Sequence, residues 1–215
     1  MVTLSIGEVE LAGELDVPQG AQGIVLFAHG SGSSRFSPRN QYVARALRAT
    51  GLATLLMDLL TREEDVVDER TRALRFDIPL LAKRLVGATD WLTHHAETRH
   101  LVIGYFGAST GAAAALVAAA ERPRVVGAIV SRGGRPDLAG GALARVRAPT
   151  LLIVGGRDET VLDLNRAALE KLRVTEKELV IVPGATHLFQ EPGALEQVAA
   201  LAAEWFRRFL NKPLE

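Results

Sequence analysis

A serine between two glycines is the residue with the clearest capacity for covalent chemistry. Gly107-Ala108-Ser109-Thr110-Gly111 has the form G-x-S-x-G, follows an apolar run and precedes an alanine-rich segment. A sharp turn from a strand into a helix can hold such a hydroxyl above a sheet, and the glycines leave room for close backbone approach. The alternative is a glycine-rich turn whose serine only caps the helix. The pattern predicts Ser109 as a nucleophile.

His187 is the histidine best placed to activate that hydroxyl. A serine needs an imidazole as base, and the imidazole needs a carboxylate to fix its tautomer. His187 follows the last expected strand and precedes the last expected helix. The other four histidines fit structural roles, one in a loop and three at a polar helix end, where a metal cluster is the weaker alternative: His29, His94, His95 and His100.

Asp158 is the predicted partner of this imidazole. It ends a glycine turn after the apolar run 151–154, one crossover before His187. Ser109, Asp158 and His187 therefore each lie just beyond the carboxyl end of a strand, in the order nucleophile, acid and base. Three other carboxylates stay open as alternatives: Glu159, Asp163 and Asp137.

A developing oxyanion needs two hydrogen-bond donors. We expect one from the backbone N–H of Thr110, the residue after the nucleophile, and the other from the backbone N–H of Ser31. Ser31 lies in the loop after the strand 23–28. Gly30 and Gly32 would let that loop approach a substrate, although a plain turn also favours glycine.

Two further segments are expected near this site. Arg35 and Arg39 are candidates for binding an anionic part of a substrate, with ordinary surface positions as the alternative. The charged stretch 61–75 reads as a solvated loop with a short surface helix. Because it follows the carboxyl end of a strand, it could also flank the substrate.

The elements that must position these residues alternate along the chain. Several apolar runs lack polar residues, as in parallel strands covered by helices on both faces. Proline near a helix start and apolar spacings of three, four and seven mark helices that begin near Pro38, Pro79 and Pro192. The order predicts an α/β fold with a mostly parallel sheet of eight strands: 3–6, 9–17, 23–28, 53–57, 101–106, 125–130, 150–154 and 179–182.

Composition restricts the classes of function. The 215 residues suit a single α/β domain, 1–215, and 25 basic against 25 acidic residues supply no field that would gather nucleic acid or anionic lipid. The absence of cysteine excludes disulfides, thiolate metal sites and a thiol nucleophile. Acidic residues near the start argue against a signal peptide, and the uncharged run 101–120 reads as a strand, a turn and a helix, so we expect a cytoplasmic protein without a membrane span.

The chain resembles the α/β-hydrolases, and in detail the small dienelactone-hydrolase-like members that occur alone or attached to phosphoribosyltransferase domains. The resemblance covers nearly the whole chain and is carried by FAHGSGSSRFSPRN at 27–40, GYFGASTGAAAAL at 104–116, LLIVGGRDETV at 151–161 and GATHLFQEPGALEQVA at 184–199. It implies Ser109 as nucleophile, Asp158 as acid and His187 as base. Dienelactone hydrolases proper use a cysteine nucleophile, so their lactone substrate is not carried over.

These observations predict a serine hydrolase that cleaves carboxylic esters or related acyl bonds of small soluble substrates, without a metal or organic cofactor. The connection between the strands near residues 130 and 150 is too short for a lid domain. Acyl transfer to an acceptor other than water and a non-catalytic binding protein stay open. An NADP-dependent oxidoreductase, with Arg132 meeting a 2′-phosphate, is disfavoured because the G-x-G-x-x-G pattern is absent.

Overall fold

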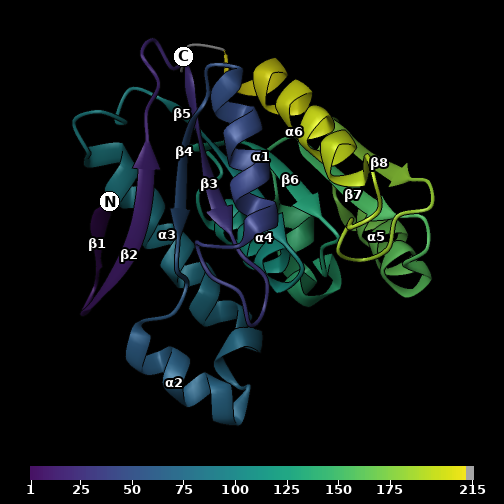
Figure 1. The fold of residues 1–215 in the computed structure, drawn as a ribbon, viewed down its shortest axis with the longest axis horizontal. Helices are drawn as coiled ribbons and strands as arrows, with labels where there is room; N and C mark the ends of the chain where they lie inside the picture. The colour runs from purple at the N-terminus through teal and green to yellow at the C-terminus, as the bar shows by residue number, and fades with distance from the viewer. Residues whose placement is uncertain (212–215) are drawn as a thin grey trace.

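Eight strands form one twisted sheet with the order β1-β2-β4-β3-β5-β6-β7-β8 in the computed structural model, which describes residues 1–211 (Figure 1). β1 and β2 pair antiparallel, β2 meets β4 antiparallel, and every other neighbouring pair is parallel. The strands are β1 Val2–Ile6, β2 Val9–Asp16, β3 Gly23–Ala28, β4 Ala53–Met57, β5 Val102–Ala108, β6 Val126–Arg132, β7 Thr150–Gly155 and β8 Lys177–Val182.

Burial explains why the sequence showed these strands so clearly. Every residue of β3, β4, β5 and β7 is buried, because helices cover both faces of the parallel part of the sheet. All eight predicted strands are present, with boundaries that differ by no more than two residues. The predicted α/β class and the eight-stranded, mostly parallel sheet are therefore confirmed.

The helices divide between two apolar layers, one on each face of the sheet. One core cluster joins the sheet to α3 and α4, and the other joins it to α1 and α6, which lie together on the near face in Figure 1. α4 packs closely because its inward face is almost entirely alanine. The bounds are α1 Pro38–Ala49, α2 Arg62–Thr71, α3 Ile78–His94, α4 Thr110–Glu121, α5 Glu159–Lys171 and α6 Ala194–Leu210.

The charged stretch 61–75 contains the predicted short surface helix, α2, which hangs below the body of the molecule in Figure 1. Thr61 and Glu64 form a capping box at its start. Glu64 also accepts a hydrogen bond from Arg84 of α3 at 2.6 Å, and Asp68 accepts one from Arg75 at 2.6 Å. These ion pairs hold in place the connection between β4 and α3, which contains α2.

The remaining crossover, residues 133–149 between β6 and β7, contains only the short 3-10 segment η2 Pro136–Arg145. It packs on α4 and α5 and adds no lid domain, as predicted. Within residues 1–211, no helix combines the length and apolarity needed to cross a membrane.

Candidate active site

Ser109 occupies a sharp turn between β5 and α4. Its backbone has φ 50° and ψ −121°, a region that a residue with a side chain rarely adopts. A Cβ added at Gly107 would lie 2.4 Å from the Ala112 Cα, and one added at Gly111 would lie 2.3 Å from the Ala28 oxygen. Only glycine fits at either position, so the two glycines let the turn close and present the serine at the carboxyl end of β5.

His187 and Asp158 lie at the carboxyl ends of the neighbouring strands β8 and β7. The His187 Nδ1 is 2.6 Å from the Asp158 Oδ2. Because a carboxylate only accepts, Nδ1 carries the hydrogen and Nε2 is the nitrogen that can accept a proton. Gly155 allows this pairing, since a Cβ there would lie 2.4 Å from the Ala185 oxygen in the loop that carries His187.

The alternative carboxylates have other positions and partners. Asp137 accepts from Arg135 at 2.7 Å, and that hydrogen-bonded guanidinium lowers the pKa of Asp137. Asp163 lies within α5, as predicted, and pairs with Arg166. Glu159 is the first residue of α5. Of the four carboxylates considered, the structure brings Asp158 to His187.

Ser109 and His187 line one cavity of about 230 Å³ at the carboxyl edge of the sheet. This is slightly below the size of pockets that hold drug-sized ligands, about 300–1,000 Å³. Two arginines and three other serines also line it. The lining residues are Gly30, Ser31, Ser33, Ser37, Arg39, Ala108, Ser109, Arg132, His187 and Leu188.

The segments that carry the two predicted oxyanion donors both lie near Ser109. Thr110 is the first residue of α4, so its N–H has no acceptor within the helix. A Cβ added at Gly30 would lie 3.1 Å from the Ser109 Cβ, which shows how closely the Gly30 backbone approaches the serine, and Ser31 lines the same cavity as Ser109. Gly32, in contrast, turns away: it has φ +65°, and a Cβ there would lie 3.0 Å from the Arg75 Nη1 near α2.

The structure does not bring Arg35 to this cavity. The Arg35 guanidinium forms an ion pair with Asp58 after β4, and the Arg35 N–H donates to the same carboxylate at 2.8 Å. Arg35 lies before the start of α1, and its ion pair with Asp58 holds its side chain there. Arg39, the second residue of α1, lines the cavity instead.

Arg132, at the end of β6, is a cavity residue that sequence reasoning considered only for the disfavoured dinucleotide site. Its backbone oxygen accepts from the Ser109 N–H at 3.4 Å, so it is a direct neighbour of the predicted nucleophile. The signal that could have revealed it is its position two residues beyond an apolar run, on the same sheet edge as Ser109. The predicted strand ended too early, at Val130, to include it.

The remaining histidines have structural contacts. His29 donates from Nδ1 to the Gly30 oxygen at 2.9 Å, and its Nε2 accepts from the Leu59 N–H at 3.0 Å. Burial lowers the pKa of His29, and its two hydrogen bonds join the loops that follow β3 and β4. His95 stacks on Trp91, and His94 lies within hydrogen-bond distance of the Asp90 oxygen. Among residues 1–211, no group of three or more His, Asp or Glu side chains could hold a metal ion.

The sheet order and the turn at Ser109 define the α/β-hydrolase fold. A crystal structure of an α/β serine hydrolase without a lid, from Xanthomonas campestris, has the same fold, with a TM-score of 0.76 and 21% identity over 98% of this chain and 94% of that one. Residues 11–212 match the model of the dienelactone hydrolase family, and the chain belongs to this family.

Two relatives are much more similar in sequence. The crystal structure of a dienelactone hydrolase from Anabaena variabilis shares 67% identity and a TM-score of 0.96, over 97% of this chain and 96% of that one. A putative phosphoribosyl transferase of Mycobacterium tuberculosis is 61% identical over 99% of this chain. The match covers 47% of that protein, so the chain spans about half the length of this curated relative.

Proposed function

We propose that this chain is a serine hydrolase that cleaves carboxylic ester bonds, or related acyl bonds, of small soluble substrates. The observation that carries the proposal is the 2.6 Å contact between His187 Nδ1 and Asp158 Oδ2, made by an imidazole that shares a cavity with Ser109. An oriented imidazole beside a serine on a strained turn is the arrangement that activates a hydroxyl.

The reaction would proceed in two halves. The Ser109 Oγ attacks the substrate carbonyl carbon while its proton moves to His187 Nε2, and the Thr110 and Ser31 N–H groups stabilise the resulting oxyanion. The tetrahedral intermediate collapses, the bond to the leaving alcohol breaks, and His187 returns the proton to that alcohol. Water then attacks the acyl-enzyme by the same route and releases the acid. Asp158 stays ionised and stabilises the imidazolium.

The shape of the site favours small substrates. The cavity of about 230 Å³ cannot enclose a long acyl chain, and the connection between β6 and β7 supplies no lid that would cover one. We therefore expect short acyl esters to be hydrolysed faster than long ones. The serine in place of the cysteine of dienelactone hydrolases proper argues against carrying over their lactone substrate.

Phosphoribosyl transfer is a poorer description of this chain. The name of the M. tuberculosis relative refers to a protein about twice as long, and the dienelactone hydrolase model covers almost all of the segment shared with it. We propose that the shared segment is the hydrolase part and that the transferase name describes the other half.

A fluorophosphonate probe tests the proposal without knowledge of a substrate. We expect one probe molecule per chain and, by peptide mapping, an adduct on Ser109. Ser109→Ala should abolish labelling, whereas Ser5→Ala, which changes an exposed serine on β1, should label like the parent. Labelling at another residue would remove Ser109 as the nucleophile. An unlabelled parent chain that hydrolyses no short aryl ester would favour the non-catalytic alternative.

A further inference from the structure

Arg132 is a buried cation without an acidic partner among residues 1–211. Its residue is 6% exposed, its Nε is buried without a hydrogen-bond partner in the described chain, and its guanidinium makes one long contact, 3.4 Å from Nη2 to the Asn40 Oδ1. A buried charge normally has an ion pair or a full set of hydrogen bonds, because desolvation is otherwise uncompensated. A side chain in this condition on the wall of a cavity indicates that a ligand supplies the missing negative charge.

A second cation lies close to the first. Arg39 lines the same cavity, and its Nε is also buried without a partner in the described residues. Burial, with the nearby Arg39 charge as the smaller cause, lowers the pKa of Arg132 to about 10. Arginine side chains keep their charge in proteins. No ion pair within residues 1–211 involves Arg132 or Arg39. The cavity therefore holds two positive charges that the described protein does not neutralise.

Hydroxyl donors complete the lining. Ser31, Ser33 and Ser37 are among the residues that line the cavity, and Ser37 is also the N-cap of α1. As N-cap, Ser37 accepts from the Asn40 N–H, which leaves its O–H hydrogen available for donation. The amino-terminal, positive end of α1 thus lies at the same wall as Arg39.

We propose that this wall binds a phosphate group on the part of the substrate that does not react. A phosphate monoester carries a charge of about −2 and three acceptor oxygens, which match two guanidiniums and a set of serine hydroxyls. A carboxylate carries one charge and two oxygens and would leave one cation unneutralised. The proposal rests on the proposed hydrolase function for its reacting half, with the acyl carbon at Ser109 and the phosphate at Arg132 and Arg39.

The size of the cavity limits the distance between these two parts. Ser109 and Arg132 are linked through their backbones and share a cavity of about 230 Å³. The phosphate must therefore lie only a few bonds from the scissile carbonyl. The geometry points to a small phosphorylated ester, rather than to a long molecule with a remote phosphate.

Three 4-nitrophenyl esters with acyl chains of equal length, ending in methyl, carboxylate or phosphate, test the specificity. We expect kcat/KM to be at least about tenfold higher for the phosphate ester than for the methyl ester. Arg132→Met and Arg39→Met should each reduce this ratio at least about tenfold, because methionine keeps an unbranched apolar stem and removes the guanidinium charge and its donors. Arg166→Met, on the exposed side of α5, should leave the ratio unchanged. Equal rates for the three esters, or a preference for the carboxylate, would overturn the proposal.

A binding measurement separates this proposal from the proposed hydrolysis. Calorimetry of Ser109→Ala with inorganic phosphate, at constant ionic strength, should show binding that is lost in Ser109→Ala/Arg132→Met and in Ser109→Ala/Arg39→Met. Arg39 is only half-buried, so its variant keeps the test decisive if the Arg132 variant does not fold. Absence of phosphate binding to Ser109→Ala contradicts the phosphate site, whereas an inactive parent chain that binds phosphate contradicts only the hydrolase.

Discussion

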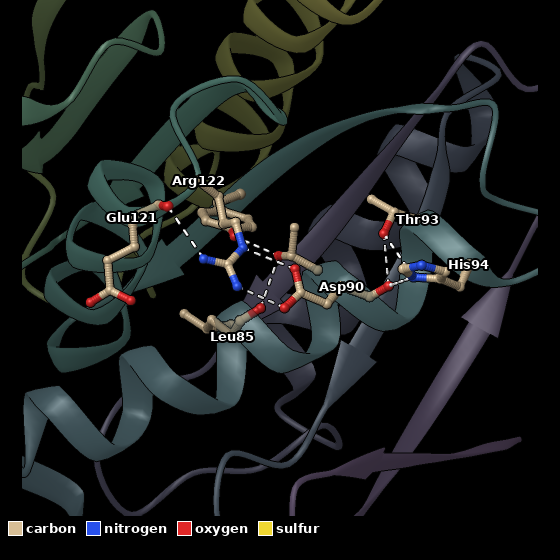
Figure 2. Close-up of polar contacts among 8 residues, drawn as sticks. Leu85, Asp90, Thr93, His94, Glu121 and Arg122 are labelled. Atoms are coloured by element: carbon tan, nitrogen blue, oxygen red, sulfur yellow. Dashed lines mark hydrogen bonds and ion pairs between the residues drawn. The ribbon is translucent and has the colours of Figure 1, made fainter.

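Two arginines on opposite sides of this molecule have contrasting surroundings. Arg122, at the carboxyl end of α4, donates to both oxygens of Asp90 on α3, at 2.9 and 2.7 Å, and to the Glu121 oxygen (Figure 2). The guanidinium of Arg132, at the carboxyl end of β6, has only the long contact to Asn40 within the described part of the chain. The first joins two helices, and the second lies on the wall of the cavity that contains Ser109.

The two pKa values move in opposite directions for reasons that follow from these surroundings. The hydrogen-bonded carboxylate of Asp90 raises the pKa of Arg122, while burial lowers that of Arg132 to about 10. A cation with its own carboxylate contributes to the fold. A buried cation without a carboxylate lowers the stability of the folded protein, but it can bind an anionic ligand. Such a cost in stability is expected at a functional site. We therefore expect substitutions near the cavity to change activity and those around Arg122 to change stability.

The largest effect should come from Ser109→Ala. Removing the nucleophile should reduce kcat/KM for a short aryl ester by at least about 10³-fold. The melting temperature should not fall, because the lost hydroxyl makes no hydrogen bond that the described structure records. Steady-state kinetics check the loss of kcat/KM, and a thermal melt of the same preparation checks the melting temperature. A variant that retained a tenth of the parent activity would remove Ser109 from the mechanism.

Asp158→Asn should have the next largest effect. An amide no longer fixes the His187 tautomer, and loss of this role costs up to about 10⁴-fold in kcat in the well-studied serine proteases. We expect a decrease of at least about 10²-fold here. Asp137→Asn is the matched control: its partner is Arg135, so it should keep kcat within about threefold. Equal losses in the two variants would show that Asp158 has no special role.

Tyr105→Phe tests the structural side of the comparison. The Tyr105 hydroxyl lies 2.5 Å from the Thr89 Oγ1 in the core beneath Arg122 and Asp90, where burial raises the pKa of Tyr105. The variant should lose about 1 kcal/mol of unfolding free energy, because Thr89 still donates to the Leu85 oxygen. Urea denaturation measures the loss. A large decrease in kcat without a change in stability would contradict the division between the two regions.

Arg122→Met should have the smallest effect. The Asp90 side chain is 49% exposed, so solvent screening keeps the loss below about 1 kcal/mol. The pH dependence of the stability difference between the parent and Arg122→Met has a definite sign. The hydrogen bond from Arg122 lowers the folded-state pKa of Asp90 below its unfolded value. The stability difference between parent and variant should therefore be present at neutral pH and disappear as the pH falls through the lowered folded pKa. Urea denaturation of parent and variant at pH 7 and pH 3 measures this difference. A stability difference that is larger at pH 3 than at pH 7 would contradict the prediction.

The sequence predicted the frame of the molecule well because burial leaves a simple pattern. The strands are apolar where helices cover both faces, and prolines mark the starts of α1 and α3. The chain order of Ser109, Asp158 and His187 was sufficient to expect an imidazole–carboxylate contact, since the carboxyl ends of parallel strands meet at one edge.

The cavity wall formed by Arg132 and Arg39 was harder to predict, because composition does not show which arginines have acidic partners. Arg35 and Arg39 are four residues apart, and Asp58, which follows β4, forms an ion pair only with Arg35. In the sequence Arg132 follows an apolar run, as many surface residues do, and only the folded structure shows that its guanidinium pairs with no carboxylate of residues 1–211. Such pairings depend on side chains far apart in the sequence, beyond what local patterns encode.

The crossover at residues 133–149 also divides the proposed machinery along the chain. The part of the chain before the crossover contains the Ser109 hydroxyl, both proposed oxyanion donors and the two cavity arginines. The part after it contains the carboxylate and the imidazole, which follow β7 and β8. Cleavage within this crossover would yield two complementary fragments, each with an incomplete site. Their reassembly could be followed by recovered turnover, which would make the fold a basis for a split-enzyme reporter of protein association.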